Sequence, residues 1–356
     1  MIRTPCLQGA LLIIGTSVGA GMLGLPVESG AYGFFPSLFL LIAVWAIMTA
    51  TAFALVSLFT PERRSANFAS LTGEILGNKM RALTFCVYIA LFVSLTFAYV
   101  KGGSLFIGDR IGMPQSGGTL LFLSLLVPFL VIGPRATSLP NALLTFLLFA
   151  AFFFLVGVGG GGVREGLIAR AEWKESWGAT PLFITSFGFH SILPSLYRYT
   201  GSKRVTRHAI VIGTTTTLLL YVVWHYVVLG SVGPSTLAEA LRADQTAVPA
   251  LIASTPTPLL PVAFAALAFA ALTTSFLGVG LGLIDFLLDA LSLPNRRRHR
   301  LTIALLIYVP AGIASLSSLR IFYLSLTYGG GIACAYLLIA LPLALSWKHR
   351  HRDRHR

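Results

Sequence analysis

Ile13-Ile14-Gly15-Thr16-Ser17-Val18-Gly19-Ala20-Gly21-Met22-Leu23-Gly24-Leu25-Pro26 lies in the middle of the first apolar stretch of the chain. Four glycines, two hydroxyl side chains and a proline are poor material for a helix that crosses a membrane without interruption. An unpaired backbone N–H or C=O group costs several kcal/mol in hydrocarbon, so irregular backbone persists only where it lines a polar cavity. The segment therefore predicts a first helix that is broken at mid-membrane beside a binding site, an arrangement typical of secondary transporters.

The composition places most of the chain in lipid. Of its 356 residues, 56% are hydrophobic and only 11% are charged, and the mean hydropathy is +0.82. Uncharged runs of about 20 residues, the length that spans a bilayer, recur along the chain. The sequence predicts an all-α polytopic membrane protein with about ten transmembrane helices, over residues 7–27, 36–58, 82–107, 118–134, 138–160, 177–197, 208–230, 261–287, 301–318 and 322–346.

The basic residues indicate the orientation of these spans. The formal net charge is +14, and with a cytoplasmic N-terminus nineteen of the 26 Lys and Arg residues fall inside and seven outside. This is the bias that the positive-inside rule describes, and it predicts that both termini are cytoplasmic. We expect the basic tail, 347–356, to contact anionic lipid headgroups. No aromatic-interleaved module accompanies it, so we expect membrane lipids and no nucleic acid as partners.

The cysteines and loops give no sign of a second function. Cys6, Cys86 and Cys334 lie in three different spans, with neither a metal-ligand spacing nor a disulfide framework, so we expect small apolar residues and no metal site. The longest external loops, 161–176 and 231–257, are too short to hold a core of their own. The sequence therefore predicts a single membrane transport domain over residues 1–356.

A second interruption appears five spans after the first. Span six contains Thr185-Ser186-Phe187-Gly188-Phe189-His190-Ser191-Ile192-Leu193-Pro194 and runs in the opposite direction to span one. Paired interruptions in oppositely oriented halves are the best sequence pointer to a transporter's binding site. We therefore expect two inverted five-helix repeats, about 7–160 and 177–346. The alternative is two glycine kinks whose backbone groups are satisfied by neighbouring helices.

Three polar features fall at one depth in the bilayer. Spans one and six are centred near Ser17 and Phe187, and span eight, which is uncharged from Pro261 to Leu283, is centred near Thr273-Thr274-Ser275. A break leaves N–H groups near Ser17–Gly21 that suit a carboxylate. Free carbonyls near Ser186 and Phe187 suit an ammonium group. Together they predict a site for a zwitterionic amino acid.

The predicted substrate-binding residues come from the two breaks and from nearby aromatic side chains. Phe187, Phe189, Tyr88 and Tyr99 are candidates for an apolar pocket, although each such aromatic residue more often packs or faces lipid. The full predicted set is Gly15, Thr16, Ser17, Gly19, Ala20, Gly21, Tyr88, Tyr99, Ser186, Phe187, Gly188, Phe189 and His190.

Three segments carry a resemblance to a known family. They are the segment from Gly15 to Pro26, the segment from Phe187 to Tyr197 with the following Lys203-Arg204, and Thr274-Ser275-Phe276-Leu277-Gly278-Val279-Gly280-Leu281-Gly282-Leu283-Ile284-Asp285-Phe286-Leu287. The chain resembles the hydroxy/aromatic amino acid permease family of bacterial tyrosine and tryptophan permeases, and its chlamydial tyrosine transport members in particular. The likeness runs in matching order from about residue 6 to residue 347.

The resemblance implies a leucine-transporter-like fold, a bacterial inner-membrane location and uptake of aromatic amino acids by proton symport. Tyrosine is the first expected substrate, followed by tryptophan and phenylalanine. Members usually have an eleventh span, whereas this sequence has its basic tail after the tenth, which leaves peripheral contacts and the oligomeric state open. Another amino acid such as serine or threonine, or a sensor that binds without transport, remains an alternative.

Several residues are candidates for coupling to an ion, and we expect no cofactor. Thr274 and Ser275, with Val18, match the position that binds sodium in sodium-coupled relatives of the fold, so sodium is the alternative to the proton. His190 can relay a proton, bond a substrate hydroxyl, or bridge two helices as a neutral imidazole. Asp285 is either a coupling group or, as its place near Arg296–Arg298 favours, part of an ion pair.

Two other classes of function are not expected. Gly19-Ala20-Gly21-Met22-Leu23-Gly24 matches the dinucleotide-binding fingerprint formally, but that motif needs a preceding strand in a soluble βαβ unit. An enzyme needs a nucleophile, a base and an orienting group, or a set of metal ligands, in one place. The sequence shows no such cluster, so we do not expect an enzyme.

Overall fold

Helices form nearly all of the regular structure that the computed structural model describes, over residues 4–60, 66–174, 176–243, 247, 251, 259–316 and 330–354. In chain order they are α1 (Thr4–Ser17), α2 (Ala20–Ser29), α3 (Phe34–Leu58), α4 (Phe68–Leu76), α5 (Asn78–Ile111), α6 (Gln115–Ile132), α7 (Pro134–Gly159), η1 (Gly160–Gly162), α8 (Glu165–Ile168), η2 (Ser176–Ala179), α9 (Thr180–Ser186), η3 (His190–Ile192), α10 (Leu193–Thr200), α11 (Lys203–Ser231), α12 (Pro234–Arg242), α14 (Leu260–Ala290), α15 (Arg297–Ser315), α17 (Gly330–Cys334), η5 (Ala335–Ala340) and α18 (Leu341–Arg354).

The long helices have the length and surface of membrane spans. Within the described residues seven helices qualify by length and apolar composition: α3, α5, α6, α7 with η1, α11, α14 and the segment Gly331–His351. The bent pair α1 and α2 makes an eighth span. Large apolar side chains point outward, with Leu120 73%, Phe146 75% and Leu306 70% exposed. Such an apolar exterior is expected where lipid rather than water is the surrounding solvent. The chain is therefore a multi-pass membrane protein.

The two remaining expected spans, 177–197 and 301–318, are not among these eight. Residues 177–197 are divided among η2, α9, η3 and α10, so no single long helix forms there. The span expected at 301–318 is α15, which begins with a basic turn at Arg297, Arg298 and Arg300. The first part of the span expected at 322–346 lies outside the described residues, and its helix is described from Gly330 onward.

The first helix breaks where the glycines predict. The N–H of Val18 still donates to the Ile14 carbonyl at 2.7 Å, but Gly19 is extended, with φ −123° and ψ −153°. The chain then restarts as α2 at Ala20, and the axes of the two halves differ by 51°. The interruption is two residues long and leaves the last carbonyls of α1 and the first N–H groups of α2 without intrahelical partners.

The second break lies in the expected segment of span six. Helix α9 ends at Ser186, and the N–H of Gly188 closes a tight turn on the Thr185 carbonyl at 3.0 Å. Helix α10 begins only at Leu193, with Pro194 in its first turn, where a missing N–H costs little. Helix α14, in contrast, runs unbroken through Thr274 and Ser275.

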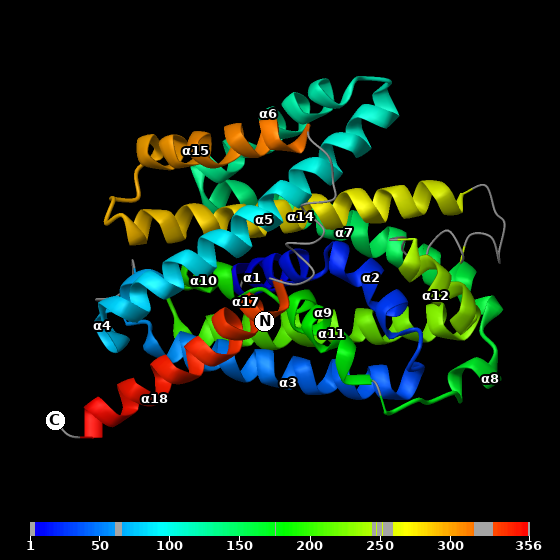
Figure 1. The fold of residues 1–356 in the computed structure, drawn as a ribbon. Helices are drawn as coiled ribbons and strands as arrows, with labels where there is room; N and C mark the ends of the chain where they lie inside the picture. Colours follow the sequence, from blue (N-terminus) through cyan, green and yellow to red (C-terminus); the bar gives the residue numbers. More distant parts are fainter. Residues whose placement is uncertain are drawn as a thin grey trace.

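The broken helix lies at the centre of the bundle. Figure 1 shows α1 and α2 between α7 and α14 on one side and α3 and α11 on the other. Helix α1 packs against α11, α14 and α7, and α2 packs against α9. The two breaks are therefore surrounded by long helices, and their polar backbone faces the interior of the molecule.

Candidate functional site

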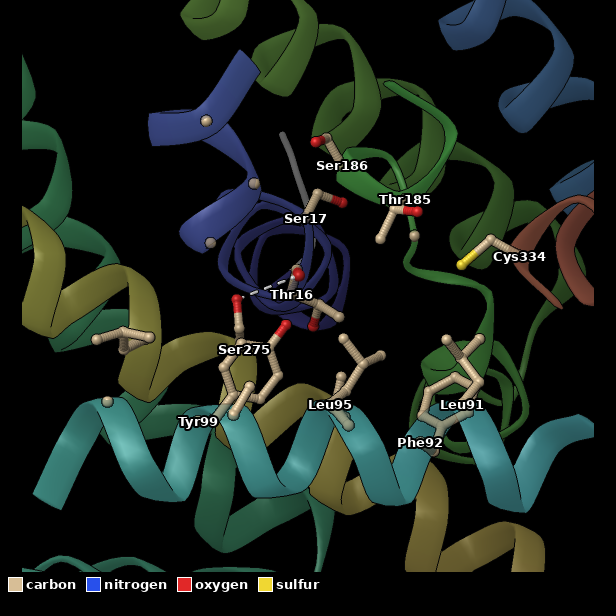
Figure 2. Close-up of a pocket in the computed structure, with 18 of the residues that line it drawn as sticks. Thr16, Ser17, Leu91, Phe92, Leu95, Tyr99, Thr185, Ser186, Ser275 and Cys334 are labelled. Atoms are coloured by element: carbon tan, nitrogen blue, oxygen red, sulfur yellow. Dashed lines mark hydrogen bonds between the residues drawn. The ribbon is translucent and has the colours of Figure 1, made fainter. Parts of the chain in front are cut away.

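A cavity of about 350 Å³ lies between the two breaks, α5, α14 and the α17–η5 segment. Figure 2 shows the cavity with Ser17 and Ser186 at the breaks and Leu91, Phe92, Leu95 and Tyr99 projecting from α5. The predicted residues that line it are Thr16, Ser17, Gly19, Gly21, Tyr99, Ser186, Gly188 and Ser275. The structure thus brings together residues from the first break, the second break and the middle of α14.

Ser275 fixes α14 against the first break. Its hydroxyl lies 3.3 Å from the Gly15 carbonyl oxygen and 3.4 Å from that of Thr16, and it donates to these acceptors. Figure 2 marks the bond from Ser275 to Thr16 and shows the Tyr99 side chain of α5 close to the same serine. The hydroxyl of Thr274 instead donates to the Ala270 carbonyl of its own helix at 2.8 Å. One polar cluster therefore joins α1, α5 and α14.

Gly21 lets the two breaks touch. A Cβ atom built on Gly21 would lie 2.6 Å from the hydroxyl oxygen of Ser186, closer than real Cβ atoms approach. The Ser186 hydroxyl donates to the Leu182 carbonyl at 2.8 Å, so the serine is held within its own helix. The close approach explains why a glycine occupies this position of the first break.

The first break offers hydrogen-bond donors to the cavity. The N-terminus of α2 carries the partial positive charge of its unpaired N–H groups. Beside it, the buried hydroxyl of Ser17 has no hydrogen-bond partner among the described residues. A backbone N-terminus next to a hydroxyl group suits a carboxylate. Ala20 begins α2, which places its backbone at this end of the cavity.

Tyr221 of α11 joins the carbonyl ends of both breaks, a role that the sequence did not reveal. Its hydroxyl oxygen lies 2.7 Å from the Ser17 carbonyl oxygen and 2.8 Å from the Ser186 carbonyl oxygen. The side chain is fully buried. A tyrosine hydroxyl has one hydrogen and can donate fully to only one acceptor at a time. Only one of the two carbonyls at a time therefore receives the Tyr221 hydrogen, and the Ser17 carbonyl also accepts from the Gly19 N–H at 2.9 Å.

A column of stacked rings forms one wall of the cavity. Phe92 lines the cavity and stacks on Tyr88 at 4.1 Å between centroids, and Tyr88 stacks on Phe286 of α14 at 3.8 Å. Tyr88 was predicted to contact the substrate, but the described structure puts it one layer behind. Phe92 takes that position because residues four apart share a helix face.

The remaining predicted aromatic residues also lie away from the cavity. Phe187 packs edge-on against Tyr221, with 5.1 Å between ring centroids, and Phe189 is buried beside His190. His190 contacts Thr51 of α3 at 2.9 Å through Nε2, so it bridges two segments, and its Nδ1 has no partner within the described residues. Gly15 and Val18 likewise belong to the break without lining the cavity.

Asp285 forms a buried ion cluster outside the cavity. It pairs with Arg198 of α10 and Arg300 of α15, and Ser195 donates to it. The expected ion pair is therefore present, but its partners are not Arg296–Arg298. Arg300 also donates to the Leu130 carbonyl at 2.8 Å, so the cluster connects α6, α10, α14 and α15.

The sequence assigned no role to three further residues that line the cavity. Figure 2 shows the side chain of Thr185 close to that of Cys334, and both line the cavity. Lys101, which was counted among the external basic residues, is buried in α5, and its ammonium donates to the Ser315 carbonyl at 2.7 Å. Helical spacing gives the face of a residue on its own helix, but not the neighbour that this face meets.

Comparisons with known proteins agree with this architecture. A family model described as the tryptophan/tyrosine permease family matches residues 3–356. Tyrosine-specific transport system 1 of Haemophilus influenzae is 32% identical over 351 residues, which cover 96% of this chain and 87% of that protein. The tryptophan-specific transport protein of the same organism is 26% identical and covers 97% of this chain and 88% of its own length.

Solved structures share the fold. MhsT, in complex with L-phenylalanine, superposes with a TM-score of 0.66 at 15% identity, covering 95% of this chain and 87% of its own. Mhp1 with bound bromovinylhydantoin gives a TM-score of 0.62 at 13% identity, with coverage of 94% and 78%. The expected leucine-transporter-like fold, with its interrupted first and sixth helices, is confirmed.

Proposed function

This chain belongs to the tryptophan/tyrosine permease family, and on that premise we propose that it imports aromatic amino acids across a bacterial inner membrane by cation symport. Family and relatives are transport proteins, not enzymes. Tyrosine is the first proposed substrate, followed by tryptophan and phenylalanine. The observation that carries the proposal is the cavity at which both helix breaks meet.

The breaks supply complementary charge for an amino-acid backbone. The substrate carboxylate would lie at the N-terminus of α2 beside the Ser17 hydroxyl, which has no partner in the described part of the chain. The substrate ammonium would donate to the carbonyl, of Ser17 or Ser186, that does not receive the Tyr221 hydrogen, and the Ser17 carbonyl would share it with the Gly19 N–H at 2.9 Å. Both charged groups of a zwitterion then find partners without an opposing side-chain charge.

The opposite wall supplies apolar surface for the substrate side chain. Leu91, Phe92 and Leu95 line the cavity from α5, and Leu338 lines it from η5. Phe92 is held rigid by its stack on Tyr88, so an aromatic substrate ring can pack against a fixed ring face or edge. A volume of about 350 Å³ falls within the usual range of small-molecule sites.

Among coupling ions we favour the proton over sodium. The hydroxyls of Thr274 and Ser275 donate to the Ala270 and Gly15 carbonyls, at 2.8 Å and 3.3 Å. These bonds use the hydroxyl hydrogens and occupy part of the Gly15 carbonyl oxygen, which a sodium ion at this position would have to share with Ser275. His190 is the candidate proton carrier, because its buried ring contacts Thr51 through one nitrogen only within the described structure.

The proposed cycle is alternating access around the central cavity. Repeat one, 7–160, and repeat two, 177–346, would form a single transport domain whose interrupted helices act as hinges. Both termini would be cytoplasmic, as the positive-inside bias predicts. The basic tail that follows Trp347 would rest on anionic lipid headgroups.

Transport by purified protein in vesicles tests the proposal. We expect labelled tyrosine to accumulate in the vesicles under an inward proton gradient. This uptake should stop after addition of a protonophore and should not require sodium. Unlabelled tryptophan and phenylalanine should compete, whereas serine and threonine should not. Gly21→Leu is the inactive control, because its side chain would enter the space of Ser186. Binding of tyrosine without flux would contradict a transport role and indicate a sensor.

A further inference from the structure

A groove of about 570 Å³ lies outside the central cavity, at the end of the bundle where α3 ends and α11 begins. It follows the contact between α3 and α18. Its lining residues run from Ala50 to Ser57 on α3 and from Leu343 to Arg350 on α18, and Arg207 of α11 completes the described set. On both long helices the positions follow the spacing i, i+3, i+4, i+7, so one face of each helix forms a wall of the groove.

The groove changes from apolar to basic along its length. Figure 1 shows that α3 and α18 run toward the same end of the molecule. Ala50 and Leu343 therefore lie at the deeper end, and Ser57 and Arg350 lie at the outer end. Seven residues of helix separate the two ends on each wall, a length of about 10 Å. The floor between them is formed by small and apolar side chains such as Ala54.

Arg207 is held beside the groove by contacts between α11 and α3. Its guanidinium lies over the Phe53 ring, 5.9 Å from the ring centroid. One turn earlier in α11, the Lys203 ammonium donates to the Ser57 carbonyl at 2.8 Å, which fixes the start of α11 against the end of α3. Arg350 lines the groove from α18. The basic end therefore receives one guanidinium group from each of two separate helices.

The outer end of the groove suits an anion at the level of lipid headgroups. None of the described lining residues is acidic, and Arg207 and Arg350 are both exposed. Guanidinium groups bind phosphate oxygens through paired N–H donors. Trp347 lines the groove and is 66% exposed, and such tryptophans are typical of the membrane–water interface. A molecule that complements the whole groove thus carries both a phosphate and a hydrocarbon chain.

We propose that this groove binds one anionic phospholipid, with its phosphate at Arg207 and Arg350 and an acyl chain along Ala50 and Ala54. Free phosphate would leave the apolar floor uncovered. A zwitterionic headgroup would bring its ammonium beside two arginines, with no acidic group among the described lining residues to receive it. The site includes α3 and α11, so it is distinct from a contact of the basic tail alone with headgroups. The inference requires a membrane protein and does not depend on the proposed transport.

Binding of single lipids to the purified, unaltered protein gives the first test. In native mass spectra we expect one dioleoylphosphatidylglycerol per chain, bound about 10-fold or more tightly than dioleoylphosphatidylcholine. Inorganic phosphate at millimolar concentration should not displace it. Equal affinity for the two lipids, or displacement by phosphate alone, would overturn the proposal. Because no transport is measured, neither result bears on the proposed uptake of amino acids.

Charge variants then assign the phosphate to the two arginines. Arg207→Gln and Arg350→Gln should each weaken phosphatidylglycerol binding about 5-fold, and together about 30-fold. Arg297→Gln combined with Arg298→Gln is the matched control, because it removes the same charge from exposed positions that do not line the groove. This control should keep the affinity of the unaltered protein. An equal loss in both double variants would indicate diffuse attraction to the protein surface and refute the site.

A volume variant tests the acyl chain without a change of charge. Ala54→Leu narrows the groove and should weaken phosphatidylglycerol binding about 5-fold, whereas Ala46→Leu, at an exposed position of α3 outside the groove, should not. Unchanged affinity in Ala54→Leu would place the acyl chain elsewhere and contradict the proposal. The same spectra report the oligomeric state. A dimer that is lost in the arginine variants while lipid binding is kept would assign the groove to a second copy of the chain instead.

Discussion

Tyr221 is the residue on which the geometry of both breaks depends. Its single hydroxyl lies 2.7 Å and 2.8 Å from two carbonyl oxygens that belong to segments far apart in the sequence. Buried carbonyls that lose a donor keep their full desolvation penalty. The hydroxyl therefore stabilises the fold and also sets the spacing of the binding groups.

Removal of that hydroxyl should affect both stability and transport. We expect Tyr221→Phe to lower the free energy of unfolding by about 1–3 kcal/mol and to raise the KM for tyrosine. Thermal unfolding in detergent and initial uptake rates in vesicles measure the two effects. Tyr226→Phe on the same helix is the control, because its side chain is 44% exposed and should change neither quantity. A Tyr221→Phe protein with unaltered KM would show that the spacing of the breaks does not depend on the hydroxyl.

Residues of the breaks could be predicted from sequence, but residues that meet them from other helices could not. Ser17, Gly21 and Ser186 line the cavity as expected, because backbone interruption is a local property of the sequence. Tyr88 was assigned in place of Phe92, since the choice between them requires knowledge of the helix that α5 faces. Tyr221 gave no signal, because a tyrosine in an apolar span resembles ordinary packing.

At the scale of elements, the Asp285 cluster holds four helices together. The carboxylate of α14 receives Arg198 from α10 and Arg300 from α15, and Arg300 extends to the Leu130 carbonyl of α6. The ion pair was predicted from the position of Asp285, but with the adjacent Arg296–Arg298. Those residues are exposed in the turn before α15 and its first residues, whereas Arg300 points into the bundle.

Neutralisation of this carboxylate should loosen the helix packing strongly. Asp285→Asn leaves two arginines, one of them fully buried, without their counter-charge, and we expect a loss of about 3–5 kcal/mol in unfolding free energy. Asp109→Asn, at an exposed position of α5, should change it by less than about 0.5 kcal/mol. Thermal unfolding of the two variants in the same detergent makes the comparison. Equal stability of both would contradict a clamping role for Asp285.

The whole molecule combines a predictable membrane pattern with irregular spans that follow tertiary contacts. Apolar runs located α3, α5, α7, α11 and α14 because hydropathy is a property of each segment alone. The extents of α9, η3 and α10 could not be read in the same way. Their boundaries depend on the partners that satisfy the exposed backbone, which come from other parts of the chain.

The orientation of the molecule can be tested with two single cysteines. In a variant whose Cys6, Cys86 and Cys334 are replaced by alanine, Gly166→Cys lies in an external loop of the proposed topology and Ser292→Cys in a cytoplasmic one. An impermeant maleimide applied to intact spheroplasts should label Gly166→Cys and leave Ser292→Cys unlabelled until the membrane is opened. Gly166 has open space around it, so the substitution is tolerated there. The reverse labelling pattern would invert the topology.

The stacked column has a mechanical consequence. Its last ring, Phe286, directly follows Asp285 in α14. The end of the ring stack and the carboxylate that pairs with two arginines are therefore consecutive residues of one helix. A ligand that packs against the cavity-facing side of Phe92 therefore contacts one end of a stack of three rings whose other end adjoins Asp285, the residue of α14 that pairs with α10 and α15. Ligand binding in the cavity is thereby coupled to the packing of α14 against α10 and α15.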